Sequence, residues 1–276
     1  MNWITKFILV ACGILAIAGT KALAHISYTG RNFGTLIINA DVSNNTQTVS
    51  SGFGWADATD ADWGDSHRGR FFRFTLASPL EVDQSVRITV ERNLLGTGAQ
   101  GTFLSAFSLF SGLAQGSPES LAHDSSTLSV ASRPNTTEGS FRSLTDWSIG
   151  NDDTYNTAGL PTSGVKYAAR LAFFTYIGHA ADGTSANFGN AAGINGDGVA
   201  DGFVTASFSG LSAGDYSLFV GGANYALQSD ETDTTKFSTI PTYGVTVSAA
   251  LVPEPSTGPL FLSGVALLAM IRRRKG

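Results

Sequence analysis

Cysteine is almost missing from this chain. The single cysteine, Cys12, lies in an apolar run near the N-terminus. If that run is removed, the remaining chain can form no disulfide and can use no cysteine nucleophile or thiolate metal site. The body, about 228 residues long, must then be stable through its hydrophobic core alone, and a chain of this length can bury one.

An excess of basic residues is also lacking. Residues 25–252 contain 11 basic and 21 acidic residues, which gives a net charge of about −10. A domain with this charge does not attract nucleic acid or anionic lipid, but it does attract cations.

The third feature that is lacking is a long amphipathic helix pattern. Short apolar runs with a period of two recur instead between Gly-rich turn signals. One example places Phe72, Phe74 and Leu76 on the same face. Residues 166–177 fit either a strand or a buried helix. We predict an all-β antiparallel β-sandwich or jelly roll over residues 25–252, with strands at residues 35–38, 71–76, 86–90, 107–112, 203–208, 216–222 and 243–247.

Residues 1–24 have the pattern of a secretory signal peptide. Lys6 precedes an apolar run at residues 7–18, and the small residues Ala22 and Ala24 mark a cleavage site that would make His25 the first mature residue. The alternative is an uncleaved anchor, but the run is shorter than the roughly 20 residues that a membrane-spanning helix needs. We therefore predict export through the Sec translocon.

The C-terminus combines an apolar run with a basic cluster. Residues 259–271 are apolar, and Arg272, Arg273, Arg274 and Lys275 follow at once. Basic residues next to an apolar helix mark the cytoplasmic side of a membrane. The pattern predicts a translocated domain whose tail stops in the inner membrane. A hydrophobic core helix is the alternative.

Pro253, Glu254 and Pro255 stand just before this apolar run. The tripeptide, the apolar helix and the terminal basic cluster, in this order over residues 253–276, closely resemble the PEP-CTERM sorting signal. Such proteins occur in Gram-negative bacteria that make extracellular polysaccharide. The resemblance implies processing near residues 253–255 by an exosortase, an integral-membrane cysteine protease. It also implies a stop-transfer role for Arg272 to Arg274, transient contact with the inner membrane, and a final location on the cell surface or outside the cell.

The body carries a weaker resemblance. The order "FRFTL", "VRITV", "AFSLFSGL" and "DYSLFVGGANY" is similar to β-sandwich modules of secreted bacterial proteins, including the pre-peptidase C-terminal type. Segments such as "HISYTGRNFGT" and "GWADATDADWGDSH" look like those shared by a group of PEP-CTERM proteins. This resemblance implies a fold and no activity.

A candidate calcium site is formed by Asn195, Asp197 and Asp201 in the run "NGDGVAD". Calcium takes several oxygen ligands, and acidic or amide side chains around a tight glycine turn supply them. The run resembles one turn of a thrombospondin type 3 repeat. Compared with an EF-hand loop, Gly193 and Val204 occupy positions that need carboxylates. An ordinary Gly/Asp turn is therefore the alternative.

Three tryptophans lie close to aspartates in the sequence, namely Trp55, Trp63 and Trp147. Sugar rings stack on tryptophan, and carboxylates accept hydrogen bonds from hydroxyl groups, so these residues are candidate sugar contacts. The interpretation that we favour is structural, with tryptophans capping the core and aspartates in solvated turns. Paired carboxylates could also serve glycoside hydrolysis, but clusters of this kind are more often turns.

Two further patterns resemble catalytic or metal-binding motifs. Residues 210–214 match G-x-S-x-G around Ser212, but that motif needs a helix after the turn and a strand pattern follows here. We expect Ser212 to be a hairpin residue. An N-terminal His25 could chelate copper, but nothing else in the sequence supports such a site. We predict no catalytic residues and no enzyme.

Two functions remain open from the sequence. The first is an exported, exosortase-sorted surface or matrix protein with a non-catalytic β-sandwich, stabilised by calcium and associated with exopolysaccharide and biofilm. The second is a secreted carbohydrate-binding module or a polysaccharide-active enzyme.

Overall fold

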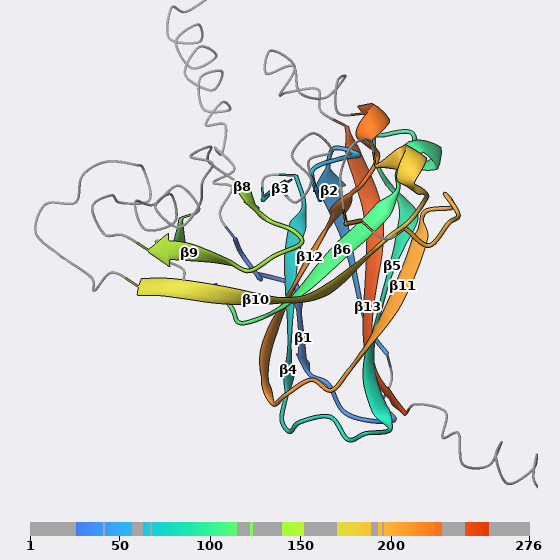
Figure 1. The fold of residues 1–276 in the computed structure, drawn as a ribbon. Helices are drawn as coiled ribbons and strands as arrows, with labels where there is room; N and C mark the ends of the chain where they lie inside the picture. Colours follow the sequence, from blue (N-terminus) through green and yellow to red (C-terminus); the bar gives the residue numbers. More distant parts are fainter. Residues whose placement is uncertain are drawn as a thin grey trace, which may run out of the picture.

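A computed structural model describes residues 26–40, 42–56, 63–66, 68–114, 122–123, 140–151, 170–188, 193–194, 196–227 and 241–253. These residues form strands and short 3₁₀ turns, which confirms the all-β fold predicted from the sequence (Figure 1). Within these ranges, none of the helices has the length and apolar character needed to cross a membrane. The predicted signal peptide and the tail after Pro253 lie outside the described residues.

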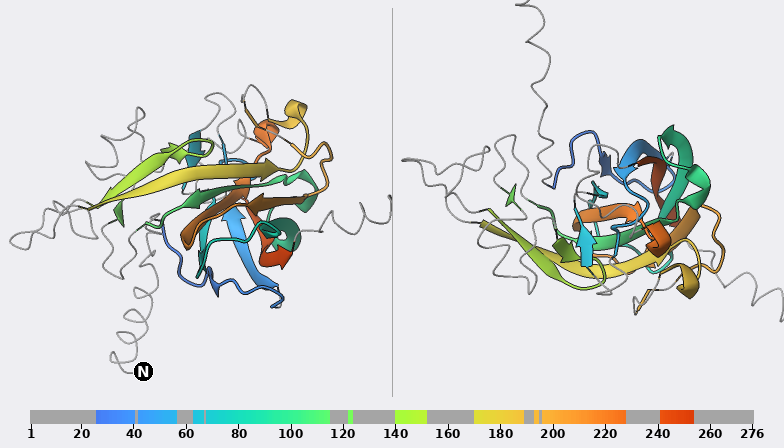
Figure 2. Two further views of the ribbon diagram at one scale, coloured as in Figure 1. Left: turned by 60° about the horizontal axis from the view of Figure 1, so that its bottom comes forward. Right: turned by 90° about the horizontal axis from the view of Figure 1, so that it is seen from above.

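The larger sheet has seven strands. In spatial order they are β1 (Asn32–Thr35), β4 (Arg70–Leu76), β12 (Gly214–Gly222), β6 (Ser105–Ser111), β10 (Arg170–Ala181), β9 (Trp147–Asn151) and β7 (Ala122–His123). All neighbouring pairs are antiparallel except β1 and β4, which run parallel. Figure 2 shows β10 lying along β6 and extending beyond it to β9.

The smaller sheet has four strands in the order β11 (Phe203–Ser209), β5 (Gln84–Gly96), β13 (Thr242–Pro253) and β2 (Ser43–Ser50). All three pairs are antiparallel. A two-stranded ribbon joins β3 (Trp63–Asp65) to β8 (Ser140–Arg142). Three 3₁₀ turns, η1 (Gln100–Thr102), η2 (Ser185–Asn187) and η3 (Tyr225–Leu227), lie in the connections.

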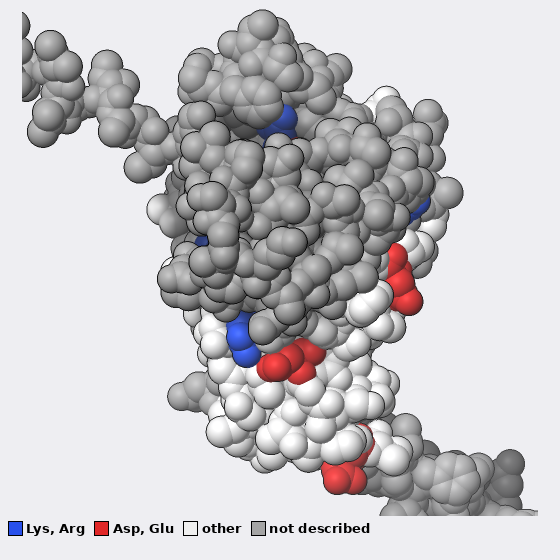
Figure 3. Space-filling model, turned by 90° about the vertical axis from the view of Figure 1, so that its left-hand side faces the viewer, with Lys and Arg blue, Asp and Glu red and all other residues white. Residues whose placement is uncertain are grey.

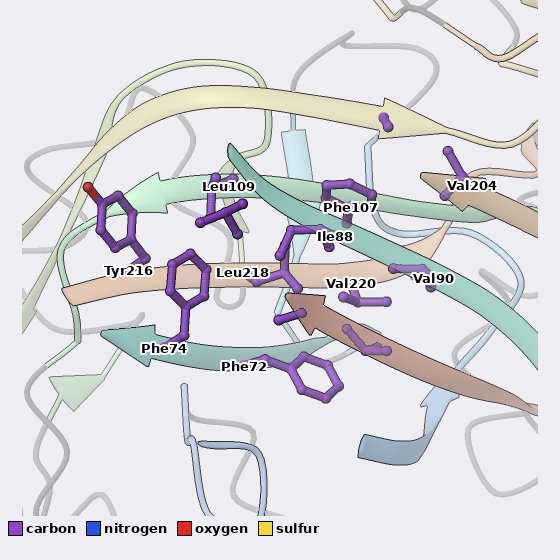
Figure 4. Packing of buried hydrophobic residues seen from close by; sticks show 14 of the residues in the cluster. Phe72, Phe74, Ile88, Val90, Phe107, Leu109, Val204, Tyr216, Leu218 and Val220 are labelled. Atoms are coloured by element: carbon purple, nitrogen blue, oxygen red, sulfur yellow. The ribbon is translucent and has the colours of Figure 1, made fainter. Parts of the chain in front are cut away.

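The first hydrophobic core fills the space between the two sheets (Figure 4). The larger sheet contributes alternate residues of β4, β12 and β6. The smaller sheet contributes alternate residues of β5 and β13, which face them. The period of two that the sequence shows in residues 71–76 and 86–90 therefore marks the inward faces correctly, because the buried side chains include Phe72, Phe74, Leu76, Val86, Ile88 and Val90.

A second core covers the opposite face of the larger sheet. The sheet contributes residues that alternate with those of the first core, such as Phe71, Phe110 and Phe219, and the segments over this face contribute the rest, many of them aromatic. Phe71 of β4 and Phe219 of β12 lie with ring centroids 4.8 Å apart, and Phe141 of β8 packs 4.4 Å from Phe219. The segments over this face are mostly irregular, so the second core follows from tertiary packing and not from a repeated strand pattern.

A close backbone approach brings one of these segments onto the sheet. Gly54 forms an isolated parallel bridge with Gly222 at the end of β12. A Cβ at Gly222 would lie 2.2 Å from the carbonyl oxygen of Gly52, so only glycine allows this contact. As a result Trp55 lies over the sheet, with its backbone N–H donating to Gly222 O at 3.0 Å.

Three segments can be compared with their sequence predictions. The ambiguous region 166–177 is a strand where it is described, because β10 begins at Arg170. The strand expected at residues 35–38 lies earlier, since β1 ends at Thr35 and Asn39 adopts a positive φ of 57°. The expected hairpin at Ser212 is wrong, because β11 pairs with β5 and β12 pairs with β4, so the connection crosses between the sheets.

The first core should account for much of the folding stability. Leu218 of β12 is fully buried, so Leu218→Ala should lower the free energy of unfolding by about 2–5 kcal/mol through lost burial and the remaining cavity. Leu94→Ala is the matched control, since Leu94 is 93% exposed and its loss should cost less than about 0.5 kcal/mol. Denaturant titration measures both, and equal effects would contradict this placement of the core.

Candidate functional site

Three aspartates meet where the loop after β10 contacts the loop before β11. The loop at residues 196–202 lies against the end of β10. Asp197 N donates to Ala181 O at 3.0 Å, and Gly198 N donates to Gly183 O at 2.9 Å. These contacts bring the carboxylates of Asp197 and Asp201 into electrostatic range of Asp182.

Asp182 is the buried member of this group, with none of its surface exposed. Its Oδ1 accepts a hydrogen bond from Asp201 N at 2.9 Å, and its Oδ2 accepts one from Gly202 N at 2.6 Å. Burial raises the pKa of Asp182, and repulsion from Asp197 and Asp201 adds to the rise, whereas the two backbone hydrogen bonds oppose it. Asp182 was not singled out from the sequence, because it lies outside the Asn/Asp run that suggested a cation site.

The two predicted calcium ligands that the structure describes also accept backbone hydrogen bonds. Asp197 Oδ1 accepts from Gly183 N and from Val199 N, each at 3.1 Å. Asp201 Oδ1 accepts from Phe203 N at 3.1 Å. Asn195, the third predicted ligand, lies outside the described residues. In the described ranges no group of three or more His, Cys, Asp or Glu side chains is arranged to hold a metal ion, and calcium stays a prediction.

Two of the three candidate sugar-contact tryptophans lie in the second core. Trp55 has none of its surface exposed, and its indole N–H donates to Ser108 Oγ at 2.9 Å. Trp147 is 6% exposed and stacks on Phe174 with ring centroids 4.3 Å apart. Neither residue offers an open ring face, so this placement favours the structural role. Trp63 lies in β3, opposite Arg142, and its side chain is outside the description.

Tyr176 and His179 form a polar pair on β10. The Tyr176 hydroxyl and His179 Nδ1 lie 2.5 Å apart. Burial raises the pKa of Tyr176 to about 12 and lowers the pKa of His179. The His179 ring lies 5.5 Å from the Trp55 ring, so it packs against the second core. His179 therefore belongs to strand β10.

The outer face of the smaller sheet carries a row of hydroxyl and amide side chains. The strand register places Thr205, Thr89, Ser248 and Asn44 side by side across β11, β5, β13 and β2. Thr89 and Thr205 share a hydrogen bond at 3.0 Å, and Ser248 Oγ donates to Asn44 Oδ1 at 2.5 Å. Alternating Thr and Ser in residues 203–209 is the sequence signal for this face, but the row itself depends on the register.

Charged side chains are few on one described part of the surface. On the side shown in Figure 3, most of the described surface is neither acidic nor basic. Two ion pairs occur in the described ranges, Arg68 with Asp65 and Arg73 with Asp215, each at 3.4 Å.

The C-terminal segment continues a central strand. Leu251, Val252 and Pro253 are the last residues of β13 and pair with residues 84–86 at the start of β5. Figure 1 shows β13 leaving the sandwich at its lower end, beside the loop that joins β4 to β5. Glu254, Pro255 and the terminal basic cluster follow outside the described residues.

Asp182 should be a structural carboxylate. Asp182→Ala leaves the buried N–H of Gly202 and the N–H of Asp201 without this acceptor, and each unsatisfied donor costs about 1–3 kcal/mol. We expect a loss of about 2–4 kcal/mol in the free energy of unfolding, measured by denaturant titration. Asp201→Ala, which removes a single exposed hydrogen bond, is the control. Equal small losses for both variants would contradict the structural role.

The solved structures that resemble this chain include a surface-associated protein and a secreted protein. CorA of Methylomicrobium album BG8, described as a surface-associated copper-binding protein, is 16% identical over 83% of this chain and 99% of that chain, with a TM-score of 0.45. MopE of Methylococcus capsulatus, a secreted protein in which an oxidised tryptophan facilitates copper binding, is 15% identical over 84% of this chain and 92% of that chain, with a TM-score of 0.42. At these sequence identities and TM-scores, the similarity does not indicate which ligand this chain binds.

Sequence comparison with curated proteins finds no significant match. The resemblance to pre-peptidase C-terminal modules is not shown by any of these comparisons. A family model for the PEP-CTERM protein-sorting motif matches residues 251–275, which confirms the sorting signal expected over residues 253–276. The chain therefore carries a PEP-CTERM protein-sorting motif, which indicates an exported protein that is processed by an exosortase.

Proposed function

We propose that the protein is a non-catalytic β-sandwich of the cell surface or extracellular matrix that associates with extracellular polysaccharide. The observation that carries this proposal is the outer face of the smaller sheet. There, hydroxyl and amide side chains from four adjacent strands lie in register, as in the row of Thr205, Thr89, Ser248 and Asn44.

The chemistry of this face suits a neutral or weakly charged glycan. A second row crosses β13 and β2, where Thr46 and Thr246 hydroxyls lie 3.3 Å apart. Hydroxyl and amide groups both donate and accept hydrogen bonds, as sugar hydroxyls do. An antiparallel sheet with one solvated face also provides a broad, gently twisted surface, along which an extended polymer can make many weak contacts at once.

The alternative, a polysaccharide-active enzyme, needs a positioned acid and base. The buried carboxylate of Asp182 is held by two backbone N–H groups, and the described candidate tryptophans are packed in the second core. These roles support a scaffold more than a catalyst. The other alternative, a carbohydrate-binding module, differs little from the proposal. The experiment below tests whether the outer face of the smaller sheet is the surface that binds the polysaccharide.

Export and sorting complete the proposal. Residues 1–24 direct the chain to the Sec translocon and are removed after Ala24. The apolar run at residues 259–271, with Arg272, Arg273, Arg274 and Lys275 on its cytoplasmic side, holds the precursor transiently in the inner membrane. Exosortase then acts near residues 253–255, and the sandwich remains outside.

Removing hydroxyl groups from the face should weaken binding to polysaccharide. Thr89→Val combined with Thr205→Val keeps the shape and strand preference of both side chains but removes two hydroxyls. We expect retention of the purified domain on polysaccharide from the producing bacterium to fall by about fivefold, because each lost hydrogen bond contributes about 0.5–1.5 kcal/mol. The control is Thr29→Val with Thr35→Val, at exposed positions away from the face. Equal retention by both double variants, or none by the wild type, would refute the proposal.

Calcium is the second part of the proposal. Asp197 and Asp201 each repel the carboxylate of Asp182, and a cation at the loop of residues 195–201 would offset this repulsion. Two EF-hand positions lack carboxylates, so we expect a Kd on the order of 10⁻⁴–10⁻³ M. Millimolar calcium should then raise the melting temperature, as binding to the folded state alone requires.

The variant Asp197→Ala should remove most of that rise. Magnesium should raise the melting temperature less than calcium, because it gives up its water ligands reluctantly. A melting curve that does not move with calcium would show that the loop is only a turn.

A further inference from the structure

The sorting motif begins inside the folded sandwich. The matched residues start at position 251, and Leu251, Val252 and Pro253 still belong to β13. Leu251 also packs against the first core. The folded body and Pro253-Glu254-Pro255 are therefore joined without a linker, so a protein that binds the tripeptide must also lie against the end of the sandwich.

One side of this strand end is open among the described residues. The pairing of β2 with β13 stops at Ser43 and Ala249, whereas the pairing of β5 continues to Gln84 and Pro253. From Ala250 onward β13 thus has β5 as its single strand neighbour in the described ranges. An extended strand with one free edge is the form in which a partner can add a strand of its own.

Exposed apolar side chains lie on both sides of this strand end. Val42, just before β2 on the side of the free edge, is 42% exposed, and Val82, just before β5 on the other side of β13, is fully exposed. Val82 lies in the turn where Gln84 N donates to Glu81 O at 3.0 Å, and Gln84 is the residue that pairs with Pro253. Glu81 and Asp83 stand on either side of Val82. These acidic neighbours oppose contact with an anionic lipid surface and favour a protein partner.

We propose that this end of the sandwich, consisting of the free edge of β13 at residues 250–253 with Val42 and Val82, is the docking surface for the protease that processes the tail. The protease adds a strand to the free edge and covers the two valines, so that the tripeptide enters its site directly from a folded strand. This inference rests on the proposed processing by exosortase and adds to it a contact with the folded body.

The test follows processing of the full chain in the exporting bacterium by pulse-chase labelling and the loss in mass. Val42→Ser with Val82→Ser should slow processing by about fivefold, because two apolar side chains no longer gain from burial against the partner. The matched control is Leu94→Ser with Leu95→Ser. Both are exposed apolar residues, and both lie toward the opposite end of the sandwich, where Glu91 pairs with Phe203. The control should be processed at the wild-type rate.

Two further chains, with and without Val42 and Val82, carry an inserted linker. They distinguish a loss of docking from a general defect in processing. Eight Gly/Ser residues inserted between Val252 and Pro253 move the tripeptide up to about 25 Å from the sheet. With this insertion, processing should no longer depend on whether Val42 and Val82 are present. The melting temperature of each variant, expected to match that of the wild type, shows that the fold is kept.

The outcomes are distinct. Equal rates for wild type and Val42→Ser/Val82→Ser would overturn the docking surface while leaving processing intact. An effect that persists with the inserted linker, together with weaker binding of the processed domain to vesicles of phosphatidylethanolamine and phosphatidylglycerol, would assign the valines to the membrane and overturn the proposal. A wild-type chain that is never shortened would refute processing itself.

Discussion

The structure depends on burial of the larger sheet on both faces. In β4, β12 and β6 successive side chains point into two different cores, so that Phe71 and Phe72, although adjacent in sequence, are buried on opposite sides. Apolar side chains on both faces of these strands are buried, and such burial is the dominant favourable term in folding. The described residues, which contain no cysteine, can form a stable fold in this way, and the smaller sheet can leave one face to water.

This two-sided burial explains why the second core is aromatic. The segments that cover it contribute few regular strands, so large rings fill the irregular space between a sheet and loops. Trp147 stacks on Phe174 in β10, and Phe141 packs edge-on against Phe219 in β12. Such ring pairs add stabilisation beyond their buried area. Two of the tryptophans that stand near aspartates in the sequence, Trp55 and Trp147, therefore pack in this core.

The sequence predicts the first core well and the second poorly, for a physical reason. Period-two alternation identifies an inward face, as it does for Val86, Ile88 and Val90, but a strand buried on both faces shows a continuous apolar run that does not say what covers it. The partners of Asp182 lie 19 and 20 residues further along the chain, so no local spacing reveals them. The hydroxyl row depends on register in the same way. The C-terminal sorting motif, by contrast, is contiguous and can be recognised without any structure.

The direct passage from β13 into the sorting motif also has a mechanical meaning. Flexible tethers let a surface protein rotate and sample many directions, whereas a tether that leaves from a sheet strand transmits its own direction to the whole body. Because β13 pairs with both β5 and β2 along most of its length, a group joined just beyond Pro253 would be held at a nearly fixed angle to both sheets. Neighbouring copies anchored in this way would share a common orientation, with the outer face of the smaller sheet parallel to the tether and turned sideways toward whatever surrounds the cell.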